Sequence, residues 1–105
     1  MELRVLRYFL TVAREESITK AAEVLHITQP TLSRQLAKME EDMGVTLFHR
    51  GTRKISLTNE GILLRRRAEE ILQLVEKTEQ ELTEQEEQVE GKVSIGCGEM
   101  ASVQI

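Results

Sequence analysis

The sequence is poor in cysteine, proline and aromatic residues. Its 105 residues include one Cys, one Pro, one Tyr, two Phe and no Trp. A single cysteine cannot form an internal disulfide, so the fold must rest on packing. No apolar run approaches the ~18 residues of a membrane-spanning helix, and the N-terminus lacks the basic-then-apolar order of a secretory signal. We therefore expect a soluble protein of the reducing cytoplasm that does not associate with membranes.

The residue patterns of catalysis and metal binding are also missing. His26 and His49 lie far apart, and no Cys-x-x-Cys or His-x-x-x-His spacing occurs. The sequence has no glycine-rich phosphate loop and no nucleophile and base at a recognisable spacing. Cys97 is interpreted as a small buried strand residue, or as one exposed because its domain is absent. We expect no enzyme activity, no metal and no other cofactor in this chain.

Charge is distributed unevenly along the chain. The formal net charge is -4, yet residues 1–67 carry 12 basic against 8 acidic side chains, whereas residues 68–105 carry 2 against 10. The basic N-terminal part indicates an anionic partner. The acidic C-terminal part would be repelled by that same partner.

Apolar spacing predicts two helices at the N-terminus. The first, over residues 2–16, has apolar residues three and four positions apart, which is the spacing of one helical stripe. Its predicted apolar residues are Leu3, Leu6, Phe9, Leu10 and Ala13. The second helix is short and begins near Ser17 or Thr19, either of which supplies an N-cap hydroxyl. Its predicted apolar side consists of Ala21, Ala22, Val24 and Leu25.

A third helix and a hairpin are predicted next. Thr28 supplies an N-cap hydroxyl, Pro30 suits the first turn because its missing N–H costs nothing there, and Gly44 favours a left-handed stop. The predicted buried residues of this helix are Leu32, Leu36, Met39 and Met43. Two short extended segments, 47–50 and 54–57, flank a glycine-containing turn and indicate a small two-stranded hairpin.

A long helix with a heptad pattern is predicted after the hairpin. From about Asn59 to Val89, one set of residues recurs in alternating steps of four and three, which is typical of a seam between two helices. The seam comprises Leu64, Ala68, Ile71, Val75, Thr78, Leu82, Gln85 and Val89. Such a helix would be roughly 45 Å long, at ~1.5 Å per residue, which is too long for so small a head to cover. We expect it to pair with a second copy; packing on its own chain is the alternative.

The second and third helices, joined by a tight turn, match a helix-turn-helix, whose second helix enters the DNA major groove N-terminus first. With the apolar stripe facing inward, Gln29, Ser33 and Arg34 are left on the outer face near the N-terminal end. Gln suits adenine and Arg suits guanine. Any solvated helix face carries similar residues, which is the alternative interpretation. The predicted DNA-contacting set on this helix is Thr28, Gln29, Pro30, Thr31, Ser33, Arg34 and Lys38, the last placed for a phosphate.

Cations surround the tip of the predicted hairpin. Arg50, Arg53 and Lys54 lie on or beside it. A charged hairpin directly after a helix-turn-helix can act as a wing that contacts phosphates or a narrow minor groove. A solubilising loop is the alternative. The three consecutive arginines at 65–67 form either a solvated face or a phosphate clamp.

These residues, taken in order, resemble the N-terminal winged helix-turn-helix of LysR-type transcriptional regulators. The resemblance covers about the first 60 residues and is specific because it extends across several elements. Met39 and Met43 stand where the family more often has leucine-like residues. The matching residues are Ala21, Ala22, Leu25, the run 28–36, Met39, Glu40, Gly44, Val45, Leu47, Phe48, Arg50, Leu57, Thr58 and Gly61.

The resemblance implies three parts: a winged helix-turn-helix over 1–58, a linker and dimerisation helix over 59–90, and the first strand of a missing effector domain over 91–105. In the family the long helix pairs with its counterpart in a second subunit, and the heads read inverted half-sites. The effector domain binds a small-molecule inducer, which is therefore expected for the missing part. The full-length protein could also form tetramers.

The sequence therefore predicts a mainly α chain, three helices and a two-stranded wing followed by a long dimerising helix. We expect it to regulate transcription in the bacterial cytoplasm by binding double-stranded DNA as a homodimer on an inverted-repeat operator. One alternative is a protein-interaction module that uses the winged head for docking. The other is a short winged-helix regulator without an effector domain. The predicted dimerisation residues are Leu64, Ala68, Ile71, Val75, Thr78 and Leu82.

Overall fold

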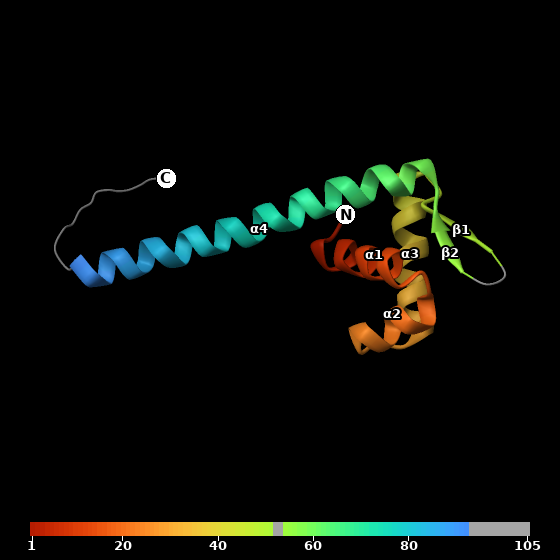
Figure 1. Ribbon diagram of the computed structural model, residues 1–105, viewed down its shortest axis with the longest axis horizontal. Helices are drawn as coiled ribbons and strands as arrows, with labels where there is room; N and C mark the ends of the chain where they lie inside the picture. Colours follow the sequence, from red (N-terminus) through yellow and green to blue (C-terminus); the bar gives the residue numbers. More distant parts are fainter. Residues whose placement is uncertain (52–53, 93–105) are drawn as a thin grey trace. The chain divides into compact units, whose positions relative to one another are not determined.

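The fold is mainly helical with a two-stranded wing, which confirms the predicted fold class. The computed structural model describes residues 1–51 and 54–92, with side chains described as far as residue 85. β1 and β2 pair antiparallel, with Phe48 opposite Leu57. None of the described helices is both long and apolar enough to cross a membrane. The elements are α1 (Leu3–Glu15), α2 (Ile18–Leu25), α3 (Gln29–Met43), β1 (Phe48–Arg50), β2 (Ile55–Leu57) and α4 (Asn59–Lys92), as labelled in Figure 1.

The ends of α2 and α3 follow local chemistry. The hydroxyl of Ser17, and not that of Thr19, caps α2 by accepting a hydrogen bond from a first-turn backbone N–H at 3.1 Å. Thr28 Oγ1 caps α3 in the same way at 3.3 Å. Gly44 ends α3 in the left-handed conformation (φ 69°), which costs glycine little. The predicted cap at Thr28 and stop at Gly44 are confirmed.

The core of the winged head, residues 1–58, lies between the three helices and the hairpin. The rings of Phe9 in α1 and Phe48 in β1 are 5.2 Å apart between centroids and both are buried. Burying one large apolar side chain contributes about 1.5–3 kcal/mol, so this cluster is the main source of stability. The other buried members are Val5, Val12, Ala21, Ala22, Leu32, Leu36, Met39 and Leu47.

The buried face of α1 is rotated from the predicted stripe. Of the predicted residues, Leu6 and Phe9 are buried, whereas Leu3 is exposed and Leu10 only half-buried. Val5 and Val12, outside the predicted stripe, are buried as well. The helix carries two adjacent apolar stripes, and spacing alone does not decide which one other elements cover. The prediction was therefore wrong for Leu3.

Two more residues are less buried than predicted. Val24 is 48% exposed because α2 is only eight residues long and buries just Ala21 and Ala22. Met43, in the last turn of α3, is half-buried because it lies at the edge of the core.

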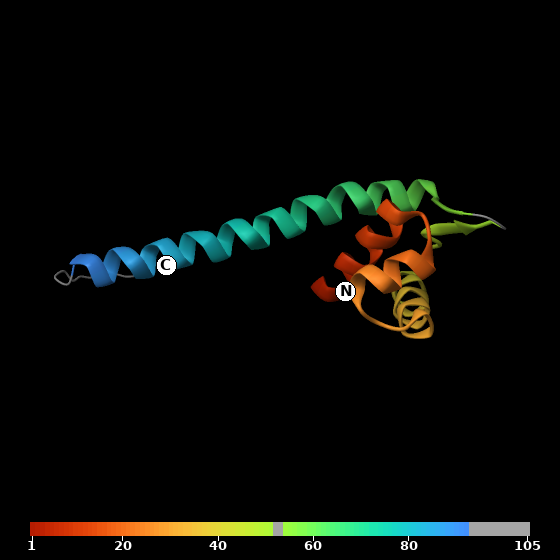
Figure 2. The ribbon, with the colours of Figure 1, turned by 60° about the horizontal axis from the view of Figure 1, so that its bottom comes forward.

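The first turns of α4 belong to the same compact unit as the head, which comprises residues 1–72. Ala68 is fully buried in its own chain and Leu64 packs against the core. Figure 2 shows the C-terminal end of α1 near the start of α4, with the rest of α1 slanting away from it. Ala68 has no exposed surface within its own chain, so its predicted contact with a second copy stays a prediction.

α4 ends later than predicted. The helix continues to Lys92, beyond the expected end at residue 90, and Gly91 lies inside it. The structure describes no residue after Lys92, so the strand predicted within 91–105, and Cys97 with it, lies outside the described residues.

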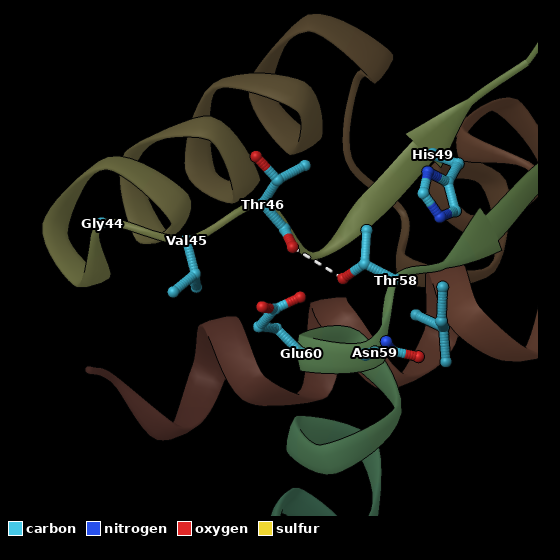
Figure 3. Close-up of a pocket in the computed structure, with 8 residues that line it drawn as sticks. Gly44, Val45, Thr46, His49, Thr58, Asn59 and Glu60 are labelled. Carbon is cyan, nitrogen blue, oxygen red and sulfur yellow. Dashed lines mark hydrogen bonds between the residues drawn. The ribbon is translucent and has the colours of Figure 1, made fainter.

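The start of α4 is joined to the segment that leads into β1. Thr58 Oγ1 donates to the carbonyl of Thr46 at 2.6 Å, as drawn in Figure 3, and accepts from the N–H of Gly61 at 3.0 Å. The Thr58 N–H donates to the carbonyl of Leu47 at 3.0 Å. A Cβ built on Gly61 would overlap that same Leu47 oxygen. Only glycine fits this crossing without a shift of the backbone.

We expect Gly61→Ala to lower the free energy of unfolding by about 1–3 kcal/mol, because the added methyl meets backbone and not a movable side chain. Gly44→Asn is the matched control: no atom lies within 4 Å of a Cβ there, and asparagine tolerates the left-handed conformation. Urea unfolding followed by circular dichroism measures both variants. Equal stability of Gly61→Ala and the parent chain would contradict a tight crossing.

Candidate nucleic-acid interface

α2 and α3 form a helix-turn-helix. His26, at the end of α2, has a left-handed backbone (φ 61°) that turns the chain, and the Ile27 N–H donates to the carbonyl of Ala22 at 3.1 Å. The two helices lie next to each other in both ribbon views (Figures 1 and 2). Ala21 and Leu32 belong to the shared core, so one face of α3 is covered and the other remains free.

The free face of α3 carries the predicted polar residues near its N-terminal end. Gln29 and Arg34 are exposed, whereas Thr31 and Ser33 are half-buried. Ser33 is less accessible than expected because it flanks the buried stripe and does not lie opposite it. Among the described residues, no carboxylate forms an ion pair with Arg34. Its guanidinium therefore keeps all its donors available to a ligand.

Hydroxyl groups fix the polar side chains at the start of α3. Thr19 Oγ1 in α2 donates to Gln29 Oε1 at 3.3 Å. Thr28 Oγ1 donates to Thr31 Oγ1 at 2.8 Å. The remaining helix residues of the predicted set, Pro30 and Lys38, are exposed. The link between Thr19 and Gln29 spans ten residues, so helical spacing could not indicate it.

Two carboxylates, that of Glu40 in α3 and that of Glu16 directly after α1, bind the described wing cations. Arg50 Nη2 donates to Glu40 Oε1 at 3.3 Å, and Lys54 Nζ donates to Glu16 Oε1 at 3.4 Å. The Lys54–Glu16 pair is exposed on both sides and is worth about 0–1 kcal/mol, so Lys54 stays available to other anions. Arg50 is half-exposed and Glu40 mostly buried, so Arg50 keeps donors free for a second anion. Arg53, the third predicted wing cation, lies outside the described residues.

Lys38 also has an acidic neighbour. Its Nζ lies 3.9 Å from Asp42 Oδ2, one helical turn further along α3, and both side chains are exposed. The contact is long and solvated, so it is weak. Lys38 is exposed as predicted, and Asp42 is an additional neighbour that the prediction did not include.

An open hollow lies beside the wing, at the junction of the head with α4 (Figure 3). His49 points from β1 toward it, and Glu60 comes from the first turn of α4. In the described part of the chain, no three His, Cys, Asp or Glu side chains gather as a metal site would require. The lining residues are Gly44, Val45, Thr46, His49, Leu57, Thr58, Asn59 and Glu60.

Curated proteins similar to this chain are transcriptional regulators by name. The chain is 46% identical over 97 residues to the HTH-type transcriptional regulator BsdA of Bacillus subtilis (strain 168), covering 91% of this chain and 33% of that protein. It is 54% identical over 61 residues to the HTH-type transcriptional regulator BenM of Acinetobacter baylyi, covering 58% of this chain and 20% of that protein. The chain thus spans about a third or less of the length of these relatives.

Solved structures with the same fold include protein–DNA complexes. The BenM_DBD/catB site 1 DNA complex matches with a TM-score of 0.78 and 43% identity, covering 80% of this chain and 93% of that one. The CbnR_DBD–DNA complex matches with a TM-score of 0.76 and 37% identity, covering 79% and 95%. Residues 3–62 match the family described as "Bacterial regulatory helix-turn-helix protein, lysR family". This chain therefore belongs to the lysR family of bacterial regulatory helix-turn-helix proteins.

Proposed function

We propose that the chain binds double-stranded DNA sequence-specifically and thereby regulates transcription. The observation that carries the proposal is the exposed face of α3, where Gln29 and Arg34 stand near the N-terminal end of the second helix of a helix-turn-helix. A major groove admits one α-helix, and its base edges offer Arg a bidentate partner in guanine and Gln one in adenine. The similarity to BenM_DBD and CbnR_DBD in their DNA complexes supports the same use of this face.

The phosphates supply most of the affinity in this proposal. Lys38 on α3 and the wing residues Arg50 and Lys54 are exposed cations. Each cation that neutralises a phosphate releases counterions, which makes binding salt-dependent. The net basic charge of residues 1–67 favours the approach of the head to DNA.

Arg34→Ala should cost about 1–3 kcal/mol of binding free energy and relax base preference at one position of each half-site, because only base edges distinguish sequences. Lys38→Ala is the matched control on the same helix. A lost phosphate contact weakens binding to all duplexes alike and lowers the salt slope by about one per contact. Binding titrations against a set of single-base variants of the site measure both. An unchanged base preference in Arg34→Ala would remove Arg34 from base recognition.

We also infer that a second copy of the chain pairs through α4. Leu74 and Leu82 are 63% and 58% exposed, and Ile71 is exposed beside them. A second copy that covers these three apolar side chains removes their surface from water, which favours pairing. Of the remaining predicted dimerisation residues, Val75 is half-buried and Thr78 exposed. Leu74, which the heptad spacing does not include, is more exposed than the predicted Val75.

Leu82→Glu should weaken the dimer at least tenfold, because burial of a leucine is worth about 1.5–3 kcal/mol and a buried glutamate has no partner there. Gln80→Glu adds the same charge to the same helix, but two residues correspond to about 200° of rotation, so it points away from Leu82. Sedimentation equilibrium of the parent and both variants gives the dissociation constants. Equal weakening by both substitutions would indicate simple charge repulsion.

A selection from a random duplex pool at fixed near-physiological salt tests the function as a whole. We expect enrichment of two inverted half-sites about one to one and a half helical turns apart, since a two-fold dimer presents two copies of α3 to one side of the duplex. Sequencing of the retained duplexes measures it. No enrichment by a folded, dimeric chain would favour the alternative that the winged head docks on protein.

A further inference from the structure

One carboxylate, that of Glu40, touches both elements that the proposed function assigns to DNA. Glu40 belongs to α3, and its Oε2 accepts a hydrogen bond from the backbone N–H of Leu47 at 2.7 Å, just before β1. Its Oε1 accepts from Arg50 Nη2 at 3.3 Å, at the far end of β1. A single side chain of α3 is thus bonded both to the start and to the end of the β1 segment.

The bond to Leu47 makes the Glu40 carboxylate a rigid anchor. A backbone donor on a carboxylate at 2.7 Å is a short, charge-assisted hydrogen bond. Leu47 is buried, and its carbonyl accepts the Thr58 N–H on the other side. The Glu40 side chain is only 16% exposed, so neighbouring atoms also restrict it.

Arg50 gains its position from this anchor. Its side chain is 46% exposed, and a guanidinium has five N–H donors in a planar fork, of which Glu40 engages one nitrogen. The other donors remain available to a phosphate. A long side chain loses rotamer freedom on binding, and one that is already held loses less. The pair therefore presents a preorganised phosphate-binding group at a fixed place relative to α3.

We propose that Glu40 is a positioning residue for DNA binding, which sets Arg50 on a backbone phosphate while α3 occupies the adjacent major groove. The proposal rests on the proposed function and deepens it. The predicted change in DNA affinity is opposite to the one that charge alone would give. A carboxylate near DNA repels phosphates, so on charge alone the removal of Glu40 would strengthen binding. Positioning requires the opposite result.

The comparison of Glu40→Gln with Asp42→Asn separates the two effects. Glutamine keeps an oxygen for the Leu47 N–H but loses the charge that holds Arg50. Asp42→Asn removes the same charge from the same helix, where the carboxylate only contacts the exposed Lys38 at 3.9 Å.

Binding to the selected duplex and to a mixed-sequence duplex is measured by fluorescence anisotropy across a salt series. We expect Glu40→Gln to bind about tenfold more weakly, with a salt slope lower by about one per half-site. Asp42→Asn should bind as tightly as the parent or more tightly.

Arg50→Gln completes the test. It should reproduce the lower affinity and slope, and adding Glu40→Gln to it should cause no further loss, since both act through one phosphate contact. Glu40→Gln binding as tightly as Asp42→Asn would overturn the proposal, as would a lower unfolding free energy with an unchanged salt slope. An unchanged slope in Arg50→Gln overturns it even if Glu40→Gln does not fold. Failure of the parent chain to bind either duplex rejects the proposed function and this proposal with it.

Discussion

The contact between the tilted rings of Phe9 and Phe48 is the one on which the rest of the head depends. These are two of the three aromatic residues in the chain, and both are buried in the cluster where α1 meets the first strand of the wing. A three-residue strand pair has little stability of its own and needs such packing to persist. α3 packs into the same cluster through Leu32 and Leu36. One small core therefore fixes both the helix and the wing.

Charge pairing complements this core at the surface. Carboxylates outside the wing bind both of its sides. Glu40 binds Arg50 in β1, and Glu16 binds Lys54, which directly precedes β2. The backbone carbonyl of Glu16 also accepts the Ile55 N–H at 3.3 Å. The same cations are the ones expected to meet phosphates. The Lys54–Glu16 pair is exposed on both sides, so a phosphate can replace Glu16 at little cost, whereas the mostly buried Glu40 keeps its bond to Arg50 and leaves the other guanidinium donors free. Arg34 differs in forming no ion pair among the described residues, which agrees with its assignment to base edges.

Features with local causes could be predicted from the sequence, and those with distant causes could not. The cap at Thr28, the stop at Gly44 and the buried stripe through Leu32 and Leu36 follow from neighbouring residues, and the structure contains them. The contact between Lys54 and Glu16 joins residues 38 positions apart, which no spacing rule links. The exposed position of Leu3 and the burial of Ala68 depend on which elements cover a helix face, and apolar spacing is the same in either case.

The crossing at Gly61 makes the join between head and linker helix stiff. Thr58 is bonded to the segment before β1 on two sides, and Ala68, two to three turns into α4, is still buried in the head. Within residues 1–72, the first turns of α4 therefore cannot rotate relative to the winged head. A torque applied to the part of α4 that lies within residues 1–72 would turn the whole winged head with it, so the direction of these first turns dictates which way the free face of α3 points.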